Sequence, residues 1–255
     1  MFEQIKKYGF LFKQLVKRDF TRKYKRTFFG MVWSVLSPLI NFFVMRMIFS
    51  NMFSHSVEHY SIYLFSGQIV YAFFSDATGM GMNSLVNNAG IFSKVNIPKY
   101  LFLFSQNVSS LINFALTLLV FFLFFIIEGM PFTWALLLLF FPIGCLIVFN
   151  TGLGLVLSAL QVFFRDMQYL WGIFTQLLMW VSAIFYTLDS FSPETQKLFL
   201  LNPLYVYIDY VRSLVLYGTV PPLGRSLLCI LYAVLAFGFG CFMYKRFNQE
   251  FLYYV

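Results

Sequence analysis

The residue types that most often carry chemistry are sparse in this 255-residue chain. The stretch from His55 to His59 has the spacing of an inverzincin motif, His-x-x-Glu-His, in which two histidines ligate zinc. Such a site also needs a third ligand and a stable helix, whereas this stretch is a short polar loop, so we expect no metal site there. The phosphate-binding sequence Gly-x-x-x-x-Gly-Lys-Ser/Thr does not occur, so we expect no nucleotide hydrolysis by this chain.

Single charges and thiols fall inside apolar stretches. Arg46 and Asp76 lie at different depths of two neighbouring stretches, so we expect no direct ion pair between them. Each should face a polar cavity or extend toward the membrane surface, and their roles stay open. The cysteines are far apart along the chain, which favours free thiols over disulfides or a metal site; they are Cys145, Cys229 and Cys241.

The elements that carry these residues are expected to lie in a membrane. Hydrophobic residues make up 60% of the chain and charged residues 11%, a balance that a soluble domain cannot bury. Six stretches are long and apolar enough to cross a bilayer: 28–53, 61–82, 101–127, 132–162, 168–188 and 226–243. The basic region before the first of them is too long for a cleavable signal peptide. The sequence therefore predicts an all-α, polytopic membrane protein with six transmembrane helices.

The N-terminal segment 1–27 is expected to form a separate unit from the transmembrane domain over 28–255. Its apolar residues recur at helical spacing over 2–20, which predicts an amphipathic helix in the plane of the membrane interface. A plain cytoplasmic tail is the alternative. The net charge of +8 is concentrated in this segment and suits anionic lipid. We expect no nucleic-acid binding, because no aromatic-rich polar module accompanies the charge.

Lysine and arginine are distributed unevenly between the two ends of the spans. The N-terminus, segment 83–100, the turn 163–167 and the C-terminus carry them, whereas the short loops around Glu58 and Glu128 carry none. Because cytoplasmic loops are enriched in these residues, both termini are predicted to be cytoplasmic. Segment 189–225 then falls on the outer side, where its polar and aromatic residues and four prolines favour two short, partly re-entrant helices.

Segment 83–100 is too apolar for a loop that only joins two spans. Its apolar residues alternate with polar ones, a pattern typical of a surface that docks a partner protein. A helix lying on the membrane surface is the alternative. The residues expected to make the contact are Asn88, Gly90, Ile91, Phe92, Ser93, Lys94, Val95, Ile97 and Pro98.

Aromatic residues make up 22% of the chain, more than contact with lipid requires. Some belong to interfacial belts, and for any single residue packing is the simpler interpretation. Aromatic faces also stack on sugar rings, so a set of them could line a passage for a sugar polymer. The candidates, all in the first, second and fifth spans, are Trp33, Phe42, Tyr71, Phe74, Trp171, Phe174, Phe185 and Tyr186.

Four stretches resemble one known family. The run from Lys17 to Leu39, KRDFTRKYKRTFFGMVWSVLSPL, resembles the start of ABC-2 type permeases, the membrane subunits of O-antigen, capsule, teichoic acid and rhamnose-polymer exporters. GMNSLV at 81–86 and KVNIPK at 94–99 are similar to the family's coupling segment. VFFRD at 162–166 and LNPL at 201–204 also match, so the resemblance covers essentially the whole chain in the expected order.

The resemblance implies a homodimer in the bacterial inner membrane that exports a lipid-linked polysaccharide. Segment 83–100 would dock a separate ATPase subunit, which would bind ATP and Mg²⁺, so this chain would hold no cofactor. The outer helices within 189–225 would act as a gate. The basic residues Arg18, Arg22 and Lys23 could attract lipid head groups or the pyrophosphate of a polyprenyl carrier.

Three other functions fit parts of the sequence. An ABC-2 permease for a drug or another small amphiphile would share the same spans and coupling segment. A membrane-embedded glycan-lipid transferase would need acidic residues grouped at one membrane face, whereas Asp76, Asp166 and Asp189 are scattered. A purely structural membrane protein would leave segment 83–100 without a purpose.

Overall fold

The computed structural model describes residues 2–24, 30–53, 59–95, 97–189 and 191–254, and every regular element within them is helical. This confirms the predicted all-α class. The longer helices are α1 (Phe2–Tyr24), α2 (Trp33–Phe53), α3 (Tyr60–Met82), α5 (Tyr100–Ile127), α6 (Phe140–Phe163), α7 (Met167–Val181), α9 (Pro203–Val215) and α10 (Leu223–Phe247). The shorter ones are η1 (Gly30–Val32), η2 (Val86–Asn88), α4 (Ala89–Phe92), η3 (Trp134–Leu139), α8 (Pro193–Phe199) and α11 (Phe251–Tyr254).

Three helical stretches are long and apolar enough to cross a membrane by length and composition. They are Tyr100–Ile127, Trp134–Phe163, which joins η3 to α6, and Leu223–Phe247. α2 contributes a shorter apolar stretch, Trp33–Phe49. The sequence predicted a fifth span that continues to residue 188. α7 instead has only 15 residues and ends in a turn after Val181. The count of six spans therefore stays a prediction.

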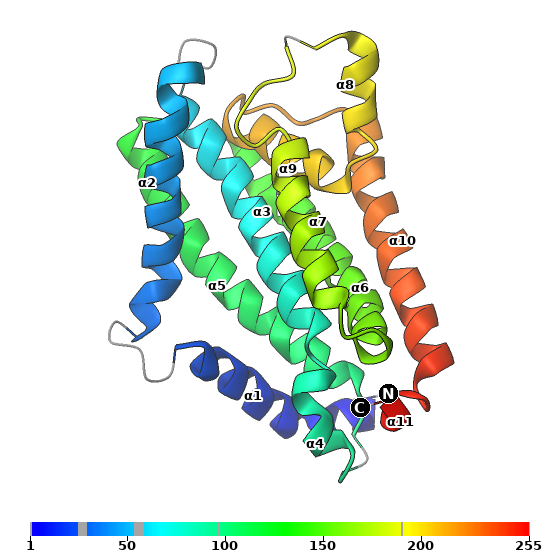
Figure 1. Cartoon of the computed structure of the whole chain (residues 1–255). Helices are drawn as coiled ribbons and strands as arrows, with labels where there is room; N and C mark the ends of the chain where they lie inside the picture. Colours follow the sequence, from blue (N-terminus) through cyan, green and yellow to red (C-terminus); the bar gives the residue numbers. More distant parts are fainter. Residues whose placement is uncertain (1, 25–29, 54–58, 96, 190, 255) are drawn as a thin grey trace.

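The long helices form one bundle with distinct ends (Figure 1). α2, α3, α5, α6, α7 and α10 run lengthwise through it, with α1, α4 and α11 at one end and α8 and α9 at the other. α1 covers most of the predicted N-terminal segment, and residues 25–27 of that segment lie outside the described residues. Leu15 and Asp19 on α1 are buried, while Phe10 is 74% exposed. One face of α1 thus packs on the bundle and the other is left open.

Glycine pairs bring the central helices into backbone contact. A Cβ atom on Gly152 of α6 would lie 2.3 Å from the backbone nitrogen of Phe237 on α10. A Cβ on Gly240 of α10 would lie 2.5 Å from the carbonyl oxygen of Gly152. A Cβ on Gly81 of α3 would lie 3.2 Å from the Cα atom of Gly154. Small residues are what allow membrane helices to approach this closely.

Segment 189–225 contains two helices, α8 and α9, as expected from its sequence. Ser192 and Asn202 cap them: the Ser192 hydroxyl accepts from the Thr195 amide at 3.3 Å, and the side-chain oxygen of Asn202 accepts from the Leu204 amide at 3.0 Å. Each cap is followed by a proline at the first helical position, where the missing N–H is not needed. The Ser-Pro and Asn-Pro sequences therefore set both helix starts.

Many of the phenylalanines pack against one another inside the bundle. Phe42 of α2 stacks on Phe65 of α3 with ring centroids 4.5 Å apart, and Phe73 of α3 stacks on Phe114 of α5 at the same separation. Such pairs bury large areas and add about 0.5–1.5 kcal/mol each beyond the area term. Much of the aromatic surplus is thus explained by contacts within one chain.

Candidate functional site

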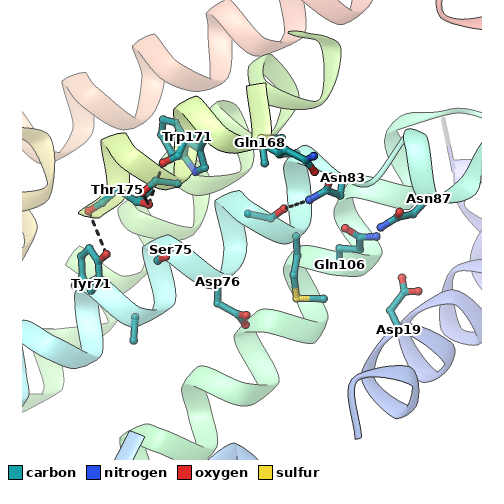
Figure 2. A pocket seen from close by; sticks show the side chains of 15 residues that line it. Asp19, Tyr71, Ser75, Asp76, Asn83, Asn87, Gln106, Gln168, Trp171 and Thr175 are labelled. Carbon is teal, nitrogen blue, oxygen red and sulfur yellow. Dashed lines mark hydrogen bonds between the residues drawn. The ribbon is translucent and has the colours of Figure 1, made fainter. Parts of the chain in front are cut away.

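A polar cavity of about 840 Å³ lies between α1, α3, α5 and α7 (Figure 2). Its wall combines two aromatic side chains, several side-chain amides and two carboxylates. The residues that give it this character are Tyr71, Trp171, Asn83, Asn87, Gln106, Gln168, Asp19 and Asp76. Amide and carboxylate groups beside aromatic faces suit a ligand that has both hydroxyl groups and C–H faces.

The two aromatic side chains are fixed by hydrogen bonds between α3 and α7. The Trp171 indole N–H donates to the Thr78 hydroxyl at 3.1 Å, and the Tyr71 hydroxyl donates to the Thr175 carbonyl at 3.1 Å. The Thr175 hydroxyl donates in turn to the Trp171 carbonyl at 3.0 Å (Figure 2). Because these bonds cross the cavity wall, the aromatic rings are held in place before any ligand binds.

One side-chain amide of the wall, that of Gln106, has an oxygen that can accept a further hydrogen bond. Gln106 of α5 is 6% exposed, and within the described part of the chain its Oε1 atom has no hydrogen-bond partner. A buried polar atom without a partner is costly, by about 1–3 kcal/mol. Gln106 lines the cavity beside Asn87 (Figure 2), so a bound molecule or water could supply the missing donor.

Asp76 lies in a wall common to two cavities. A second cavity of about 420 Å³, between α2, α3 and α5, is lined by Asp76 and by hydroxyl and amide side chains such as Ser110 and Asn113. Of the two alternatives expected for Asp76, a polar cavity or extension toward the membrane surface, its place in both cavity walls agrees with the first. Arg46 lies elsewhere: its guanidinium is 3.7 Å from the carboxylate of Glu128. The same carboxylate lies 3.8 Å from the His59 ring nitrogen.

A hydrogen-bond network ties α1 to segment 83–100. The Arg18 guanidinium donates to the side-chain oxygen of Asn88 at 2.7 Å and to the Asp19 carboxylate at 2.6 Å. Ser105 of α5 donates to the other oxygen of Asp19 at 2.8 Å, and the Asn88 amide donates to the Ser84 carbonyl at 2.7 Å. Asp19 and Asn88 are both buried, so α1, α5 and segment 83–100 meet at one polar junction.

The residues predicted to dock a partner divide into an inner and an outer set. Asn88 and Phe92 are buried, and Phe92 packs near the ring of Phe102. Gly90, Ser93, Lys94 and Val95 are exposed, while Ile91, Ile97 and Pro98 are half-buried. The exposed set lies at the end of the bundle that also carries α1 and α11 (Figure 1). These residues are accessible to a partner, and docking itself stays a prediction.

The predicted sugar-passage aromatics are spread over different surroundings. Tyr71 and Trp171 line the polar cavity and Trp33 lines the second one. Phe174 is exposed on α7, and Tyr186 is half-buried with its hydroxyl donating to the Trp180 carbonyl at 2.9 Å. The remaining three pack in the core; they are Phe42, Phe74 and Phe185. A single chain therefore brings two of the eight predicted aromatic residues, Tyr71 and Trp171, together on the polar cavity.

Two further predicted groups lie partly outside the described residues. Arg18 takes part in the junction with Asp19 and Asn88, whereas Arg22 and Lys23 belong to the last turn of α1 and their side chains are not among those described. Most of the His-x-x-Glu-His stretch, residues 54–58, also lies outside. Among the described residues, no three His, Cys, Asp or Glu side chains come together as a metal site would require.

The structure shows a buried arginine that the sequence reasoning missed. Arg212 of α9 is 4% exposed, and its guanidinium donates to the carbonyls of Ala183 at 2.8 Å and Ile184 at 2.9 Å. It also donates to the Tyr63 carbonyl at 3.2 Å and lies 3.5 Å from the centre of the Tyr63 ring. α9 is thereby fastened to α3 and to the turn that follows α7.

The amides of the cavity wall were missed as well. A signal for them exists in the third span, where polar side chains recur on one side of an otherwise apolar helix. They are Ser105, Gln106, Asn107, Ser109, Ser110, Asn113 and Thr117, and all are buried. Polar residues within a membrane span face the protein interior or a water-filled cavity, so this run pointed to a cavity beside α5.

The matched family defines the class of this protein. A sequence profile of the ABC-2 type transporter family matches residues 10–216, and the chain belongs to that family. It is 26% identical to the O-antigen export system permease protein RfbA of Myxococcus xanthus over 205 residues, 79% of this chain and 78% of the relative. It is 26% identical to RfbA of Klebsiella pneumoniae over 229 residues, 88% of this chain and 87% of the relative. The polysialic acid transport protein KpsM of Escherichia coli is 20% identical over 216 residues, 80% of each chain.

Proposed function

We propose that the chain is the membrane subunit of an ATP-driven exporter of a lipid-linked cell-surface polysaccharide. The polar cavity between α3 and α7 carries the proposal, because its fixed aromatic rings and its amides suit a sugar polymer. The functions for which the relatives are named, O-antigen export and polysialic acid transport, support the same substrate class.

The arrangement in the membrane that we propose is a six-span protomer with both termini in the cytoplasm of a bacterial cell. α2, α3, α5, α6, α7 and α10 would cross the inner membrane, α1 would lie along its inner surface, and α8 and α9 would re-enter from outside. The layout of the bundle supports this, since segment 83–100 and both ends of the chain gather at one end (Figure 1). The Lys and Arg of the loops gather there too.

The transport cycle that we propose needs a second copy of the chain and a separate ATPase. The ATPase would bind ATP and Mg²⁺ and would dock on the exposed residues of segment 83–100. Its movement would reach α1 through the junction of Arg18, Asp19 and Asn88. The two copies would enclose the passage, with the cavity of each protomer opening onto it.

The test combines purification with a deletion strain. Affinity purification of the tagged chain in mild detergent should recover an ATPase subunit. Cells depleted of the chain should lose surface glycan and accumulate a lipid-linked glycan on the cytoplasmic side. Normal surface glycan in such cells, together with dye transport by the reconstituted complex, would instead assign the chain to export of small amphiphiles.

A further inference from the structure

A third cavity, of about 700 Å³, lies on the far side of α5 from the polar cavity. Its wall includes Tyr100 and Phe104 of α5, whereas Gln106 of the same helix lines the polar cavity. Residues 104 and 106 are about 200° apart around an α-helix, so the two cavities open on opposite faces. Leu155 of α6 forms part of the wall between α5 and α10.

The wall of this cavity is apolar toward the bilayer and basic at its outer edge. Phe104, Phe237 and Cys241 lie inside the apolar lengths of α5 and α10, which are two of the three membrane-crossing candidates. Lys99 precedes α5, and Lys245 lies in the last turn of α10. Both lysines are therefore at the level where hydrocarbon gives way to head groups.

Among the described residues, no acidic side chain faces the positive charge of the cavity. No aspartate or glutamate is among its wall residues, and within the described part of the chain neither lysine has an ion-pair partner. Glu250, the nearest acidic residue along the chain, is exposed and lies outside the wall. Lys99 is 9% exposed and donates to the Asn248 carbonyl, and its burial lowers the pKa of its ammonium group. A buried ammonium beside apolar walls calls for an anion.

We propose that this cavity binds an anionic phospholipid of the inner leaflet. Lys99 and Lys245 hold the phosphate, Tyr100 lies at the level of the head group, and the acyl chains extend along Phe104 and Phe237. Basic pockets between membrane helices on the cytoplasmic side recognise anionic head groups in this way. The ligand is distinct from the exported substrate, because this wall lies on the opposite face of α5 and has one side-chain amide, Asn248, among its described residues, against four in the polar cavity.

Native mass spectrometry of the detergent-purified full chain tests the proposal. The protein is titrated with dioleoylphosphatidylglycerol and, separately, with dioleoylphosphatidylcholine. We expect the anionic lipid to bind at least about tenfold more tightly. Each of Lys99→Gln and Lys245→Gln should weaken its binding roughly fivefold, as expected for one lysine beside an anionic lipid. Lys197→Gln, which removes an exposed lysine from α8 at the opposite end, should leave binding unchanged.

Four results would overturn the proposal. Equal binding of the two lipids, or an equal loss in Lys197→Gln, would show that no specific anionic site exists. Displacement of the lipid by millimolar inorganic phosphate would show a free-anion site. Tighter binding of a polyprenyl pyrophosphate at the same lysines would show a carrier site. If Lys99→Gln fails to fold, two other variants decide the question. Lys245→Gln, at an exposed position, should still weaken binding, and Lys99→Arg, which keeps the charge, should retain it.

Discussion

Trp171 gives the polar cavity one of its two aromatic faces, and its indole is held by the hydroxyl of Thr78. Trp171→Ala removes the face, and we expect glycan export to fall by up to about tenfold, since an aromatic contact contributes about 0.5–1.5 kcal/mol. Surface glycan measured against protein level in a complemented deletion strain checks this. Trp134→Ala removes an 87% exposed indole outside the cavity and serves as the control. Equal losses in the two variants would mean that the effect is not specific to the cavity.

Arg212 illustrates how a single buried charge can fasten an element. Arg212→Ala would remove the guanidinium donor from the carbonyls of Tyr63, Ala183 and Ile184, and we expect a loss of about 3 kcal/mol or more in stability. Arg212→Lys should recover only part, because an ammonium lacks the planar fork and the stacking on Tyr63. Thermal unfolding in detergent measures both.

The neighbouring Arg225 provides the comparison for Arg212. It pairs with Asp209, but both side chains are about 30% exposed. Arg225→Gln should therefore cost less than about 1 kcal/mol, as is usual for partly solvated ion pairs. A loss as large as that of Arg212→Ala would show that burial is not what distinguishes the two arginines.

Among the elements, α1 and segment 83–100 are joined through one polar junction. Asn88→Ala removes the acceptor of the Arg18 guanidinium and should lower glycan exported per ATP hydrolysed several-fold, while the ATPase still copurifies. Reconstituted complex, assayed for both activities, measures this ratio. Lys13→Gln changes an exposed residue of the same helix and should leave the ratio unchanged. An unaltered ratio in Asn88→Ala would exclude the junction from the coupling route.

The contact between α6 and α10 depends on the absence of a side chain at Gly240. Gly240→Ala places a methyl group 2.5 Å from the Gly152 carbonyl, and we expect a loss of about 1–3 kcal/mol from overpacking. Gly238→Ala meets nothing within 4 Å and should be neutral or slightly stabilising, because alanine favours the helix. Thermal stability of the two variants in detergent gives the comparison. A tolerated Gly240→Ala would require the helices to lie farther apart.

At the scale of the whole molecule, the two ends of the bundle should face opposite sides of the membrane. In a chain whose own cysteines are replaced, Lys94→Cys should react with a membrane-impermeant maleimide only after the cells are opened. Lys197→Cys should react in intact spheroplasts, because α8 lies at the other end (Figure 1). Both positions are exposed in this chain, so in cells that lack the ATPase, access to the reagent depends on membrane side. Labelling of both from the same side would contradict the proposed topology.

The sequence predicted elements better than it predicted sites. Composition and apolar length indicated an all-helical chain, and the polar, aromatic and proline-punctuated residues of segment 189–225 indicated its two helices, because these depend on neighbouring residues. The cavity brings Asp19, Asn83, Gln106 and Trp171 together from three helices and the turn after α3, and such contacts depend on packing that no local pattern encodes. For the same reason Phe42 and Phe74, grouped with the passage residues by type alone, lie in the core.

The backbone contact between α6 and α10 has a mechanical consequence. At Gly152 and Gly240 the backbones of α6 and α10 meet without side chains between them. Because no side chains there can repack, we expect the two helices to keep their relative position. α7 is the opposite case: among its residues only Thr175 is buried, and hydrogen bonds from Tyr71 and Trp171 link it to α3. The wall that carries Trp171 is thus attached to α3 through hydrogen bonds and buries little of α7. We therefore expect a bulky polymer to be accommodated by tilting of α7 against the α6–α10 pair, and not by expansion of the whole bundle.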